Sequence, residues 1–129
     1  MFNLLKIEGG RINVHEPEMH TIGGEAETLA RGTVCVLTNG LLVAANGTTK
    51  PTHITLAKGK SGERIPTGRI ESNQVYETTV SASPASLVVG AKVQLVAGTS
   101  VDATITDGVA TIVDKLDAAA SGDIIHVRF

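Results

Sequence analysis

Short apolar runs separated by glycine-containing turns dominate the chain from Gly32 onward. The runs "GTVCVL" and "LLVAA" flank Asn39-Gly40, a dipeptide that strongly favours the two-residue type I′ turn of a β-hairpin. The runs "VDATIT" and "VATIVD" flank Asp107-Gly108 in the same way. The pattern therefore predicts a hairpin at each of these two sites.

Other segments also have the pattern of short strands. They are "THITLAKG", "QVYETTVS", "GAKVQL" and the final "DIIHVRF", in which Ile124, His126 and Arg128 alternate with Ile125, Val127 and Phe129. Helical signals are limited to "EAETLA" and "DKLDAAA". Regular spacing of short strands predicts an all-β fold, a small β-sandwich or β-barrel with at most one or two short helices.

The first 28 residues differ from the rest. Apart from a possible short strand in "NLLKI", they show neither helical nor alternating periodicity, and Gly9-Gly10 and Gly23-Gly24 interrupt them. We expect residues 1–28 to form an extended N-terminal arm that another surface must order. Residues 29–129 are expected to form the β-rich domain.

Composition narrows the choice of function. Aromatic residues make up 2% of the 129 residues, the net charge is −2, and Lys and Arg are scattered, so neither a basic patch nor stacking platforms for nucleic acid are expected. The start "MFNLLKIEGGR" is too short an apolar run for a signal peptide or a membrane span. These features predict a protein made in the cytoplasm that binds neither nucleic acid nor membrane.

The stretch "HEPEMH" places His15 and His20 beside Glu16 and Glu18, which are ligand types that suit zinc. Their spacing argues against a metal site, because in an extended chain His20 shares a face with both glutamates while His15 does not. We therefore expect no metal, and we interpret the stretch as a polar, partner-facing part of the arm.

Two other segments suggest chemistry only superficially. Cys35 sits between Val34 and Val36 in a predicted strand, which favours a buried residue over a catalytic nucleophile. "GKSGER" lacks both the earlier glycine and the following helix of a phosphate-binding loop. No cofactor and no enzymatic activity are expected.

The succession "GTVCVLTNGLLVAA", "LVVGAKVQLV", "DGVATIVD" and "GDIIHVRF" resembles the small β-rich head-decoration, or capsid cement, proteins of tailed bacteriophages from about Leu29 onward. The resemblance implies a structural virion protein, made in the host cytoplasm, that binds the outer capsid surface. It also implies a homotrimer whose subunits clamp neighbouring copies of the major capsid protein and so stabilise the head.

In this interpretation the arm attaches to the capsid, with "NLLKI" adding a strand to a capsid sheet. The expected contacts are Asn3, Leu4, Leu5, Lys6, Ile7, Glu16, Glu18, Met19 and Ile22. The two glutamates would pair with basic residues of the partner, Met19 and Ile22 would be apolar anchors, and removal of Met1 to Gly24 would leave the β domain folded.

Two alternatives remain open from the sequence. One is a β-sandwich adhesin or ligand-binding module of a phage fibre or tail protein, although sugar sites usually present exposed aromatic side chains and this chain has only Phe2, Tyr76 and Phe129. The other is an enzyme that uses Cys35 or the "HEPEMH" cluster.

Overall fold

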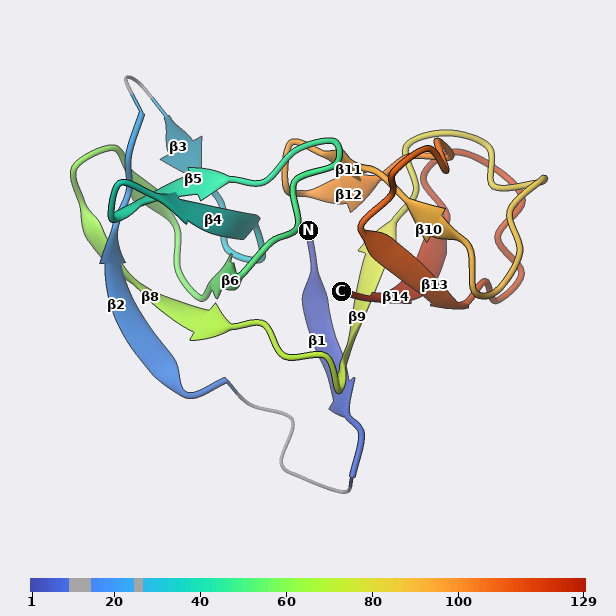
Figure 1. Cartoon of the computed structure of the whole chain (residues 1–129), viewed down its shortest axis with the longest axis horizontal. Coiled ribbons are helices and arrows are strands. Elements are labelled where there is room, and N and C mark those ends of the chain that lie inside the picture. Colours follow the sequence, from blue (N-terminus) through green and yellow to red (C-terminus); the bar gives the residue numbers. More distant parts are fainter. Residues whose placement is uncertain (10–14, 25–26) are drawn as a thin grey trace.

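The computed structural model describes residues 1–9, 15–24 and 27–129, and these form an all-β fold (Figure 1). The described residues form fourteen strands: β1 (Asn3–Ile7), β2 (Pro17–Thr21), β3 (Thr28–Leu29), β4 (Val34–Thr38), β5 (Leu41–Ala44), β6 (His53–Thr55), β7 (Gly59–Lys60), β8 (Arg64–Arg69), β9 (Gln74–Thr79), β10 (Lys92–Val93), β11 (Leu95–Val96), β12 (Ser100–Val101), β13 (Ala110–Asp114) and β14 (Ile124–Arg128). The all-β prediction is confirmed.

Two antiparallel five-stranded sheets organise the structure. The first has the order β1-β9-β14-β13-β10 and the second the order β2-β8-β6-β4-β5, with two small two-stranded sheets, β11-β12 and β3-β7, beside them. In Figure 1 the second sheet lies to the left and the first to the right, with both chain termini near the middle. No sheet of the described residues closes into a barrel.

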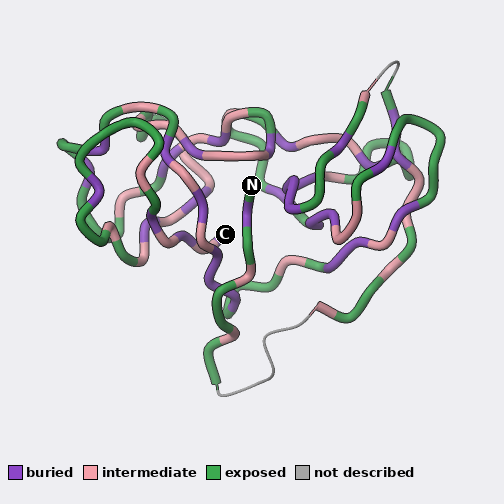
Figure 2. The backbone as a smooth tube through the Cα atoms, turned by 180° about the vertical axis from the view of Figure 1, so that it is seen from behind, coloured by how far each residue is buried: buried purple, intermediate pink, exposed green. Residues whose placement is uncertain are grey.

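The larger hydrophobic core joins the two sheets. It combines Val34 and Ile54 of the second sheet with Tyr76, Ile125 and Val127 of the first. Figure 2 shows buried residues on both sides of the N-terminus, as expected when one core extends across both halves.

The aromatic residues meet inside this core. The ring of Phe129 lies 5.5 Å from Phe2 and 5.7 Å from Tyr76, and all three side chains are buried. A second, smaller core lies between the second sheet and the small β3-β7 sheet and contains Ile22, Leu29, Cys35, Leu42 and Ile65.

The Asn39-Gly40 hairpin is confirmed. Strands β4 and β5 pair from Thr38↔Leu41 to Cys35↔Ala44, and Asn39 and Gly40 take φ values of 52° and 78°. A type I′ turn needs positive φ at both central residues, which Asn and Gly adopt most readily.

The Asp107-Gly108 hairpin is wrong. Strand β12 pairs with β11, whereas β13 pairs with β14 and β10. The predicted helix at "DKLDAAA" is also wrong, because residues 110–114 complete β13 and the following residues form turns, with Leu116 at a φ of 53°. Of "EAETLA", residues 25–26 lie outside the described residues and Thr28–Leu29 form β3.

The N-terminal segment is not a separate arm in this structure. Strand β1 pairs with β9 and strand β2 pairs with β8, while Phe2 is 1% exposed within the larger core. The expected independence of residues 1–28 from the rest of the domain is therefore corrected.

Candidate functional site

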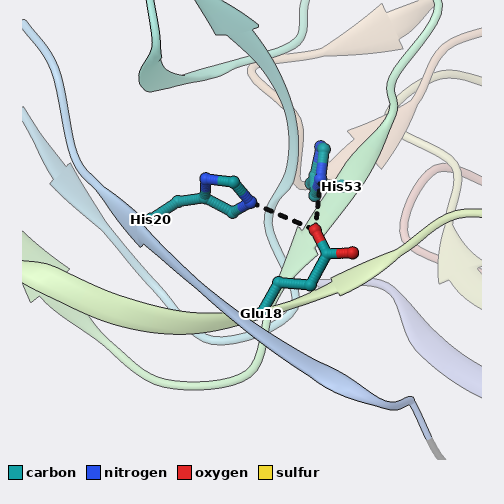
Figure 3. Close-up of side chains that lie close together, drawn as sticks. All are labelled: Glu18, His20 and His53. Carbon is teal, nitrogen blue, oxygen red and sulfur yellow. Dashed lines mark hydrogen bonds and ion pairs between the residues drawn. The ribbon is translucent and has the colours of Figure 1, made fainter.

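A cluster of three polar side chains lies on the second sheet, where β2 supplies Glu18 and His20 and β6 supplies His53 (Figure 3). The Nε2 atoms of His20 and His53 each lie 3.2 Å from Oε2 of Glu18. Figure 3 shows the carboxylate of Glu18 pointing to both rings. We call these three residues the His–Glu–His cluster.

The strand arrangement explains why the three side chains meet. Glu18 and His20 are two residues apart on β2 and so share one face of the sheet. His53 pairs directly with Cys35 of β4 and with Arg69 of β8, and directly opposed residues also share a face. The cluster is therefore a polar continuation of the second core, to which Cys35 belongs.

The carboxylate of Glu18 has a further partner on its other oxygen. Nη2 of Arg69 lies 3.2 Å from Oε1 of Glu18. The hydrogen bonds from His20 and then His53 hold the pKa of Glu18 below its usual value, and the positive charge of Arg69 acts in the same direction. Glu18 is therefore ionised at neutral pH.

His53 is the most buried member, with 7% of its side chain exposed, against 21% for His20 and 35% for Glu18. Burial lowers the pKa of His53, although its hydrogen bond to Glu18 opposes this effect. Its Nδ1 atom lies 2.8 Å from the hydroxyl oxygen of Thr52. Hydrogen bonds at both ring nitrogens, to Glu18 and to Thr52, fix the orientation of the neutral imidazole.

The sequence identified two of these residues and missed the third. Glu18 and His20 belong to "HEPEMH", whereas His53 is 33 positions beyond His20 and becomes their neighbour only through the pairing of β6 and β2 with β8. His15 is not part of the cluster: its ring stacks on Tyr76 at 5.9 Å, and burial lowers its pKa.

Cys35 has no properties of a nucleophile. It is fully buried, and its Sγ lies 3.5 Å from the carbonyl oxygen of Thr33. Burial, with a smaller contribution from the charge of Glu27, raises the pKa of its thiol to about 12. The thiol is therefore protonated at neutral pH, whereas only the thiolate form is an effective nucleophile.

The residues predicted for capsid binding are divided between surface and interior. Asn3, Leu5, Lys6, Glu16 and Met19 are exposed. Leu4 and Ile7 are half-buried in β1. Ile22, predicted to be a surface anchor, is 1% exposed and belongs to the second core, and Glu18 is held by partners within its own chain. These last two assignments are corrected.

A group of exposed apolar residues, which the sequence analysis did not identify, lies in and beside two loops of the first sheet, the β9–β10 and β13–β14 connections. Val88 and Val89, in the β9–β10 connection, are 65% and 61% exposed. Leu116 and Ile124 are also exposed and line one shallow hollow. Nζ of Lys115 donates hydrogen bonds to the carbonyl oxygens of Ala85 and Leu87, which joins the two loops. We call Val88, Val89, Leu116 and Ile124 the apolar end.

The two loops that form the apolar end lie at the right of Figure 1, opposite the edge strand β2 at the left.

Among the described residues no helix is long and apolar enough to cross a bilayer. Comparison with known proteins finds no matching family model and no matching curated protein.

Proposed function

We propose that this protein is a structural component of a tailed-phage virion that binds the outer surface of the assembled capsid. It clamps neighbouring copies of the major capsid protein. The observation that carries the proposal is the apolar end: two adjacent, strongly exposed valines on one loop, and two further exposed apolar side chains in or next to the loop that Lys115 joins to it, are typical of a contact surface.

Three of the four residues of the apolar end belong to the sequence features that carry the family resemblance. Val88 and Val89 belong to "LVVGAKVQLV", and Ile124 belongs to "GDIIHVRF". Residues that serve only to build a core are buried, whereas these three are exposed. Their exposure supports a role in contact with another protein.

A clamp needs contact surfaces on more than one side of the molecule. Met19 is exposed on β2, at the opposite side of the fold from the apolar end. Leu5 and Lys6 are exposed on β1, at the edge of the first sheet in the strand order. These separate surfaces support simultaneous contact with two capsid subunits.

Trimer formation belongs to the same proposal. Three linked copies on a symmetric site raise the effective concentration of each contact, so weak single contacts add up to tight binding on an assembled shell. A single capsid subunit in solution would bind much more weakly.

The adhesin alternative has less support. Protein sites for sugars commonly use exposed aromatic faces, and the chain has three aromatic residues in all. Phe2, Tyr76 and Phe129 are all buried. The surface formed by the described residues therefore presents no aromatic platform.

Co-sedimentation with expanded, undecorated heads of the phage whose genome carries this sequence tests the proposal. The wild-type protein should pellet saturably, and the double variant Val88→Asp/Val89→Asp should lose at least about tenfold in affinity, because each aspartate would have to be desolvated in the contact. The matched control is Ile105→Asp, which alters another exposed aliphatic loop residue (62% exposed) outside the apolar end.

The outcomes separate the possibilities. Wild-type protein that does not pellet overturns the proposed function and directs attention to glycan binding. Saturable pelleting that is equal in the wild type and the double variant retains capsid binding but removes the apolar end from the contact. Equal losses in the double variant and in Ile105→Asp also count against a specific role for the apolar end.

A further inference from the structure

We propose that Glu18, His20 and His53 form a binding site for a divalent transition-metal ion, and that zinc is the ion best suited to it. The inference is independent of capsid binding. It rests on the His–Glu–His cluster, in which one donor atom from each of the three side chains lies within 4.8 Å of the other two.

The ligand types match the ion. Two imidazoles and one carboxylate are a known donor set for Zn²⁺, which then takes water or another molecule in a fourth position. Imidazole suits Zn²⁺, Cu²⁺ and Ni²⁺, whereas Mg²⁺ and Ca²⁺ favour sets made entirely of oxygen. The cluster therefore selects the transition metals.

The distances are close to those that coordination requires. Two ligand atoms bound to a tetrahedral zinc ion at about 2.05 Å lie about 3.3 Å from each other. Oε2 of Glu18 is 3.2 Å from Nε2 of each histidine. The donor atoms of the two histidines lie within 4.8 Å of each other, so an ion would need them to approach each other by up to about 1.5 Å, which rotation of the less buried His20 ring can provide.

Groups outside the three ligands hold them in the required orientation. The Thr52 hydroxyl, 2.8 Å from Nδ1 of His53, can accept its N–H and leave Nε2 free to bind the ion. Arg69 occupies Oε1 of Glu18 at 3.2 Å and leaves Oε2 directed at the histidines. Such outer partners are typical of metal-binding histidine and carboxylate side chains.

The position in the fold suits a site that an ion can enter. All three ligands stand on strands, which place side chains more accurately than loops do. His53 is buried, whereas His20 and Glu18 are partly exposed and leave one side open. A bound ion would connect β2 to β6 across the intervening β8 and so fasten the N-terminal segment to the rest of the sheet.

Titration of chelator-treated, tag-free protein tests the site. We expect one Zn²⁺ per chain by calorimetry, a Kd on the order of micromolar or tighter, visible d–d absorption on addition of Co²⁺, and a higher Tm with Zn²⁺. His20→Gln and His53→Gln should each weaken binding at least about tenfold and reduce the Co²⁺ absorption.

The matched control is His126→Gln. His126 also faces a carboxylate, with Nε2 3.8 Å from Oε2 of Glu77, but it is not part of the three-ligand group. Binding should be unchanged in this variant. Wild-type protein that binds no stoichiometric ion overturns the proposal, as does binding that survives in His20→Gln or falls equally in His126→Gln. If His53→Gln fails to fold, the more exposed His20→Gln decides.

Discussion

The side chain of Asp123 closes the turn that leads into β14. Its Oδ2 atom accepts hydrogen bonds from the backbone N–H groups of Ala119 and Ala120, each at 2.8 Å. These two bonds hold the pKa of Asp123 below its usual value. They stabilise the ionised form in the folded chain, because only there are the two N–H donors in place.

Stability should therefore depend on pH through Asp123. A carboxylate whose pKa is lower in the folded state stabilises the fold fully above its unfolded pKa, and this contribution is lost as pH falls through the folded value. Asp123→Asn keeps an acceptor oxygen but not the charge. We expect the urea midpoint of the wild type to exceed that of the variant at pH 7, and the difference to shrink toward pH 3. A difference that is constant with pH would contradict this account.

Single residues also show where the sequence was informative. Burial of Cys35 follows from its place between two valines, and the structure agrees. Burial of Ile22 did not follow, because the polar residues around it gave no alternation that distinguishes a core position from a surface anchor. His53 could not be assigned to the cluster either, since its neighbours there are fixed by strand pairing and not by spacing along the chain.

At the level of strands, turn chemistry predicted one hairpin correctly and one incorrectly. Asn39-Gly40 has positive φ at both residues and joins adjacent strands. Asp107 also has a positive φ, of 50°, but Gly108 does not. A turn-forming dipeptide such as Asn-Gly or Asp-Gly therefore does not by itself make a hairpin. After Asp107-Gly108, β13 pairs with β10 and β14 and not with the strand that precedes the turn.

Gly108 is needed for close packing of the backbone and not for a turn with positive φ. A Cβ atom at this position would collide with the backbone of Lys92 and Val93, where N of Val109 donates to the carbonyl oxygen of Val93 at 3.0 Å. Gly108→Ala should therefore lower the free energy of unfolding by about 3 kcal/mol, since backbone atoms cannot rotate away. Urea unfolding followed by far-UV circular dichroism measures this loss.

The comparison for Gly108 is Gly122→Ala. Gly122 has a φ of 94° and no atom within 4 Å of an added Cβ, so its cost is backbone strain alone, roughly 1 kcal/mol. Equal losses in the two variants would show that conformation, and not close packing, accounts for the glycine at position 108.

For the whole molecule, the sequence indicated the fold class but not how the N-terminal segment joins it. Alternation and turn signals identified several of the strands from residue 32 onward. The pairing of β1 with β9 spans about 70 residues of chain and brings Phe2 against Phe129, contacts that no local pattern can reveal. A segment with weak periodicity therefore appeared to be an arm, although it supplies an edge strand to each five-stranded sheet and part of the core.

Removal of residues 1–7 should consequently unfold the protein or cause it to aggregate. The loss includes β1, which covers the edge of β9, and the fully buried ring of Phe2. Phe2→Ala alone should cost about 3–5 kcal/mol, a large part of the roughly 5–15 kcal/mol that stabilises a typical domain. Lys6→Ala, at an exposed position of the same strand, should change stability by less than about 0.5 kcal/mol. Far-UV circular dichroism during urea unfolding distinguishes these variants, because the chain lacks Trp. A truncated protein that keeps the wild-type midpoint would show that the first strand is a detachable arm, available to bind another surface without loss of the fold.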